Sequence, residues 1–140
     1  MTIRVICLAL VIVLFCASAS SQWVQTSTTC DSLVNSLVVS GTNLFAGTHA
    51  GGVFLSTDDG TTWNAVNSGI TALTTVNSLV VSGTNLFAGI HSGVYLSTNN
   101  GTSWTWKDIN TGLVTADVNS LVVSGTNLFA GLDGLGVYLS

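Results

Sequence analysis

Positive charge is almost missing from this sequence. Its 140 residues include two Lys or Arg residues, Arg4 and Lys107, against six Asp residues and no Glu. Nucleic acids and anionic membrane surfaces are bound through clusters of cations. We therefore expect neither of them as a partner of this chain.

Cysteine is also scarce, and its placement draws attention to the N-terminus. Met1 to Arg4 carry one positive charge, residues 5–16 form an unbroken apolar run, and small residues follow at 17–19. This order is typical of a secretory signal peptide, and the run is shorter than the roughly 20 residues that span a bilayer. We predict a signal peptide at 1–19, a secreted or extracellular protein, and no membrane attachment after cleavage. Cys30 is then a single thiol, so no intramolecular disulfide is expected.

A stretch of fourteen residues, VNSLVVSGTNLFAG, occurs three times in the chain. The copies begin at Val34, Val76 and Val118, so successive copies start 42 residues apart. A fixed period of this length is the signature of a repeat architecture.

Each repeat is predicted to form four short strands. In the middle copy we expect them at 76–81, 86–89, 93–97 and 103–106, with Gly, Asn and Ser in the turns between them. Four antiparallel strands in about 40 to 45 residues are typical of a β-propeller blade. The predicted fold is therefore all-β, with about three four-stranded antiparallel blades in an incomplete ring. The predicted segments are an N-terminal strand or linker at 20–33, blade 1 at 34–75, blade 2 at 76–117 and a partial blade 3 at 118–140.

Two of the expected turns, between the third and fourth strands, share a motif of the form SxDxGxxW, with Asn in place of the Asp in the second. Its fixed positions are Ser56, Asp58, Gly60 and Trp63 in the first copy, and Ser97, Asn99, Gly101 and Trp104 in the second. With the repeat length, this motif resembles the Asp-box of secreted bacterial BNR repeat proteins, a β-propeller superfamily that includes sialidases, xyloglucanases and a photosystem II assembly factor. The resemblance covers about residues 34–140. It implies that the box is a structural turn lying away from the catalytic face.

The resemblance to sialidases does not extend to their chemistry. Such enzymes use a Tyr nucleophile and hold the substrate carboxylate with an arginine cluster, whereas Arg4 lies in the predicted leader. Tyr95 and Tyr138 align with Phe54 in repeated third strands and are predicted to pack within the blades. A xyloglucanase-like pair of carboxylates among Asp108, Asp117 and Asp133 has no supporting motif. We predict no catalytic residue, no cofactor and no metal site.

Candidate binding residues lie on the loops that differ between copies. In an antiparallel blade, the identical SGTN turns and the box turns share one end, so the variable loops share the other. His49, His91 and Asp133 occupy matching positions there, and Trp106, Lys107 and Asp108 are peculiar to the second repeat. Because neighbouring sheets pack about 10 Å apart while zinc ligands lie about 2 Å from the ion, we interpret the matched trio as loop polar residues.

The function that this pattern favours is a non-catalytic secreted propeller module that acts in binding or as an extracellular scaffold. The alternatives are a lectin-like, glycan-binding propeller and a glycoside hydrolase-related fragment. Carbohydrate or protein is the expected ligand of the variable loops. Closed propellers have about four to eight blades, so two interpretations of the partial third blade stay open: a piece of a longer array, or a homo-oligomer that completes the ring.

Overall fold

The computed structural model describes residues 25, 33–71, 74–106 and 116–140. The predicted signal peptide at 1–19, Cys30, Lys107 and Asp108 lie outside the described residues, as does almost all of the expected N-terminal strand or linker at 20–33.

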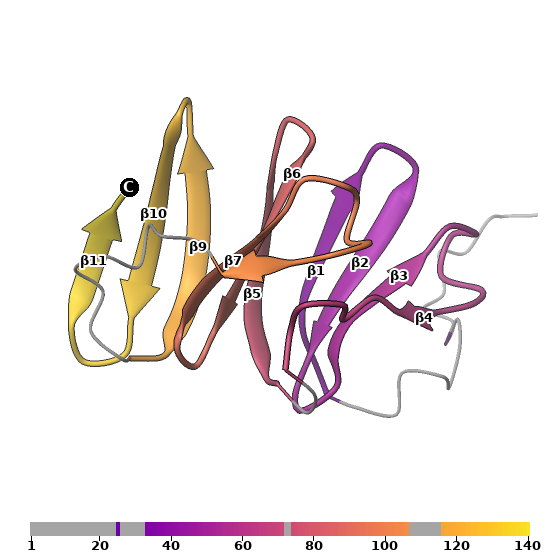
Figure 1. The fold of residues 1–140 in the computed structure, drawn as a ribbon, viewed down its shortest axis with the longest axis horizontal. Coiled ribbons are helices and arrows are strands. Elements are labelled where there is room, and N and C mark those ends of the chain that lie inside the picture. Colours follow the sequence, from indigo (N-terminus) through magenta and orange to yellow (C-terminus); the bar gives the residue numbers. More distant parts are fainter. Residues whose placement is uncertain (1–24, 26–32, 72–73, 107–115) are drawn as a thin grey trace, which may run out of the picture.

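The described residues form eleven β-strands in three antiparallel sheets that follow one another along the chain (Figure 1). The first sheet contains β1 (Val34–Ser40), β2 (Asn43–Thr48), β3 (Gly52–Ser56) and β4 (Asn64–Ala65). The second contains β5 (Val76–Ser82), β6 (Asn85–Ile90), β7 (Gly93–Ser97) and β8 (Thr105–Trp106). The third contains β9 (Val118–Ser124), β10 (Asn127–Leu132) and β11 (Gly136–Leu139).

The repeated sequence builds the first hairpin of every sheet in the same way. Gly41, Gly83 and Gly125 adopt φ values of 61°, 59° and 61° in the two-residue turns between the first and second strands. A glycine reaches this left-handed region without steric cost, and the resulting twist suits a tight hairpin. The three identical stretches therefore give three identical hairpins.

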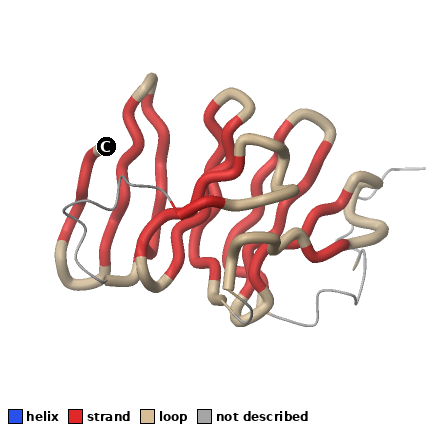
Figure 2. Tube along the Cα trace, viewed as in Figure 1, coloured by secondary structure: helices blue, strands red, loops and turns tan. Residues whose placement is uncertain are grey.

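The three sheets pack face to face, with their innermost strands β1, β5 and β9 adjacent in that order (Figure 2). One apolar core lies between the first and second sheets and contains the fully buried Phe45, Val53 and Val76. A second core lies between the second and third sheets and contains Val94 and Val118. The arrangement confirms the predicted all-β fold of propeller blades in an unclosed ring.

The fourth strand of the second sheet begins later than expected. We predicted residues 103–106, but only Thr105–Trp106 is a strand. The backbone N–H of Ser103 donates instead to the Asn99 side-chain oxygen, at 2.9 Å, and that of Trp104 donates to the Ser68 carbonyl of the preceding repeat, at 2.7 Å. The box turn and the bond to Ser68 thus occupy backbone groups that the strand would otherwise use. In the described part of the chain, no helix is long and apolar enough to cross a membrane.

Candidate functional site

The two box turns, residues 56–63 and 97–104, are closed by side-chain to backbone hydrogen bonds. The buried Ser56 hydroxyl accepts from the Gly60 N–H at 2.8 Å and donates to the Asp58 carboxylate at 2.8 Å. That carboxylate also accepts from the Thr62 N–H at 2.8 Å and from the Thr62 hydroxyl at 2.7 Å. Every one of these bonds stays inside the turn.

These donors also set the charge state of Asp58. The Thr62 N–H, followed by the Thr62 and Ser56 hydroxyls, lowers the pKa of the Asp58 carboxyl from its usual 3.8. The second turn achieves the same shape without a charge, because Asn99 accepts from Ser103 N–H at 2.9 Å and donates to the Ser103 hydroxyl at 2.9 Å. Such engaged groups hold the turn in shape.

The tryptophans of the two box turns lie in different surroundings. Trp104 is 3% exposed, and its indole N–H donates to the Val66 carbonyl of the first repeat at 2.7 Å. Trp63 is only half-buried. Trp104 therefore links the second box turn to the segment that follows β4 of the first sheet.

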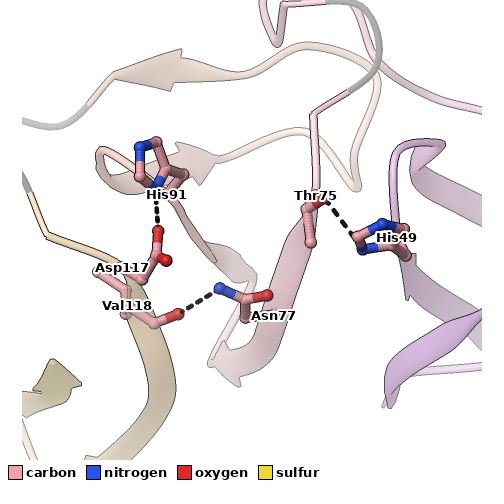
Figure 3. Close-up of polar contacts among 6 residues, drawn as sticks. All are labelled: His49, Thr75, Asn77, His91, Asp117 and Val118. Atoms are coloured by element: carbon pink, nitrogen blue, oxygen red, sulfur yellow. Dashed lines mark hydrogen bonds and ion pairs between the residues drawn. The ribbon is translucent and has the colours of Figure 1, made fainter. Parts of the chain in front are cut away.

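The opposite end of the sheets carries a repeated contact between a histidine and the residue that precedes the next innermost strand (Figure 3). His49 lies in the β2–β3 turn, and its Nδ1 atom is 3.4 Å from the Thr75 hydroxyl oxygen. His91, in the β6–β7 turn, contacts the Asp117 carboxylate through the same ring atom, an ion pair when the imidazole is protonated. The side chain of His91 is 81% exposed, so this contact stands at the surface.

A hollow of about 320 Å³ lies between these two contacts. Its lining consists of His49, Thr75, Asn77, His91 and Asp117. The amide nitrogen of Asn77 donates to the Val118 carbonyl at 3.2 Å, so this lining residue is fixed by a bond between two sheets (Figure 3). The hollow thus combines two imidazoles, a carboxylate, a hydroxyl and an amide at one edge.

The structure brings two of the predicted binding residues together at the hollow and places two others, Asp133 and Trp106, outside its lining. His49 and His91 line the hollow, whereas Asp133 lies outside its lining and its backbone N–H donates to the Asp117 carbonyl at 3.0 Å. Trp106 lies on the outer strand β8, pairs with Tyr95, and is 51% exposed. Among the described residues, no three His, Cys, Asp or Glu side chains are grouped to hold a metal ion.

The sequence interpretation missed Thr75 and Asn77 as site residues and considered Asp117 only as a catalytic carboxylate, not as a binding residue. Thr75 and Asp117 stand at the same place in successive repeats, directly before the repeated Val76 and Val118, yet their side chains differ. This difference inside an otherwise regular array was the available signal. Asn77 gave none, because it belongs to the identical stretch.

Comparison with known proteins identifies the fold and nothing finer. No family model matches the chain, and neither does any curated protein sequence. Among solved structures, the computationally designed Ika4 protein matches 76% of this chain and 64% of its own at 14% identity and a TM-score of 0.59. The extracellular domain of a B. thetaiotaomicron protein described as a one component system matches 76% of this chain at 20% identity and a TM-score of 0.60.

A GH74 xyloglucanase from Xanthomonas campestris matches 74% of this chain at 16% identity and a TM-score of 0.56. This chain corresponds to 15% of the B. thetaiotaomicron domain and to 20% of the xyloglucanase. These likenesses and the three sheets define the class, an unclosed array of β-propeller blades.

Proposed function

We propose that the chain is a non-catalytic, secreted propeller module of the Asp-box type, which binds a neutral, hydroxyl-rich ligand at the hollow. The observation that carries this proposal is the contrast between the two ends of the sheets. The SGTN turns are identical in all three copies, while the other end presents the hollow and its differing side chains. Binding residues commonly lie on loops that a rigid scaffold positions.

The chemistry of the lining favours a carbohydrate. Imidazole, hydroxyl, amide and carboxylate groups can exchange hydrogen bonds with sugar hydroxyls, and the formal net charge of −4 disfavours an anionic ligand. A polar protein segment is the other partner of this kind of surface. Secretion is supported by the predicted leader at 1–19.

We propose that the chain is non-catalytic because the carboxylates of Asp58 and Asp117 are engaged in other contacts. Glycoside hydrolysis commonly needs two carboxyl groups that flank the scissile bond. Asp58 is bonded within its turn, and Asp117 contacts His91. Neither carboxylate is paired with another one in these contacts.

Binding of neutral oligosaccharides, measured by a glycan array and then by calorimetry, tests the proposal. Replacing His91→Ala removes a lining group, and we expect about 10-fold weaker binding, the value of one hydrogen bond. Thr84→Ala, an exposed position in a turn at the other end, is the matched control and should leave affinity unchanged. A chain that binds no glycan, that binds equally well after His91→Ala, or that hydrolyses the glycan contradicts the proposal.

A further inference from the structure

The interface between the first and second sheets and the interface between the second and third sheets are made by equivalent groups of successive repeats. The side-chain amides of Asn35 and Asn77 donate to the carbonyls of Val76 and Val118, at 3.1 and 3.2 Å. One step further along, the hydroxyls of Ser36 and Ser78 accept from the backbone N–H of Leu79 and Leu121, at 2.9 and 3.0 Å. The repeated VNSLVVS stretch therefore carries both halves of one interface, with donor and acceptor 41 residues apart in the amide bonds and 43 apart in the hydroxyl bonds.

The first sheet presents one half of this interface to solvent. We call it the head face and define it by Val34, Leu37 and Val39. Val34 is 48% exposed, whereas its equivalents Val76 and Val118 are fully buried. Leu37 and Val39 are 59% and 61% exposed, although their equivalents in the second sheet pack in the first core.

The third sheet presents the other half. We call it the tail face and define it by Val122, Val137 and Leu139, which are 58%, 74% and 62% exposed. The equivalents of Val137 are Val53 and Val94, and both are fully buried against the next sheet. The head and tail faces stand on the sheets at the two ends of the row (Figure 1).

We propose that the tail face of one molecule docks onto the head face of a second copy of this chain, with the contacts that already join the sheets within one molecule. In this pairing the Asn119 amide donates to the carbonyl of the partner's Val34. The Ser120 hydroxyl accepts from the N–H of the partner's Leu37. The occupant is a second copy because the interface is continuous with the two that the chain itself contains, atom for atom.

The pairing predicts a closed dimer. A sheet added by docking continues the same step from sheet to sheet, and two copies of the three described sheets give six, inside the range of four to eight blades in closed propellers. Three copies would give nine and exceed it. Closure also covers both apolar faces at once, whereas an exposed apolar patch of this kind otherwise promotes association.

Mixing two variants tests the head-to-tail geometry directly. Leu37→Asp disables the head face and Val137→Asp disables the tail face, and neither residue is buried in the single molecule. Sedimentation velocity at up to about 100 μM should show dimers for the unaltered chain and monomers for each variant alone. A buried, unpaired carboxylate should weaken association by about 100-fold or more. The mixture should recover a dimer, because it retains one intact tail and one intact head.

Leu135→Asp is the matched control, since Leu135 lies in the β10–β11 turn and is 47% exposed but belongs to neither face. It should dimerise as the unaltered chain does. The circular dichroism spectrum of each variant establishes that the sheets are retained. The proposal is overturned if the unaltered chain is monomeric at 100 μM, if either variant alone still dimerises, or if the mixture stays monomeric.

Discussion

The Asp58 carboxylate illustrates how much one side chain can organise without forming a functional site. Three donors from its own turn converge on its two oxygens. In the second repeat Asn99 takes the same place and makes corresponding bonds with Ser103 and Ser97. The turn therefore needs an acceptor at this position, and it does not need the charge.

Asp58→Asn should remove part of the acid sensitivity of the fold. The folded-state pKa of Asp58 is lowered from 3.8, so its carboxylate stabilises the fold above that pH, and the stabilisation is lost as the pH falls through the folded pKa. Urea unfolding between about pH 2 and 7 measures this. The free energy of unfolding should fall less steeply below pH 3.8 in the variant than in the parent. Asp59→Asn, in the same turn, is the control, and equal slopes for parent and Asp58→Asn would contradict the assignment.

At the scale of the strand and turn, the sequence was informative because one pattern recurred. The turn residues fixed where strands had to end, and Gly41 and Gly83 do form the tight hairpin turns. The start of β8 could not be predicted from this pattern. It depends on the bond from Trp104 N–H to the Ser68 carbonyl, which joins residues of different repeats.

Trp104→Phe should show that the second box turn supports the contact between sheets. The change removes the bond from the indole N–H to the Val66 carbonyl and leaves a small void at a residue that is 3% exposed. We expect a loss of about 1–3 kcal/mol in the free energy of unfolding, measured with urea.

Trp63→Phe is the matched control for this change, since it alters the same motif at a half-buried position. It should cost less than about 1 kcal/mol, at a protein concentration low enough to keep the chain monomeric. Equal losses for the two variants would mean that the tryptophan acts within its own turn and not between the sheets.

At the scale of the whole molecule, the position of the hollow depends on how sheets from different repeats approach each other. The variable loops pointed to His49 and His91, but their partners Thr75 and Asp117 stand at the far ends of the same repeats, directly before the next innermost strands. Asn77 enters the lining from a strand whose sequence is identical in all three copies. A linear pattern indicates which loops share an end, whereas the side chains that meet across two sheets follow from packing.

Three equivalent glycines allow the packing between sheets to be tested within one molecule. An added Cβ at Gly47 or Gly89 would lie 2.7 Å from a methyl carbon of Val76 or Val118, each fully buried in the next sheet. At Gly131 it would instead meet the hydroxyl of the exposed Ser120, which can rotate away.

Gly89→Ala should therefore lower the free energy of unfolding by about 1–3 kcal/mol, the cost of overpacking a core. Gly131→Ala should be close to neutral, because relief of the side-chain contact is easy and alanine reduces the entropy of the unfolded chain by about 0.4–1 kcal/mol. Urea unfolding of the monomer measures both. Equal losses of unfolding free energy at the two positions would show that glycine is required by the conformation of its own strand and not by the neighbouring sheet. A larger loss at Gly89 would show that they are needed because another sheet lies directly against them.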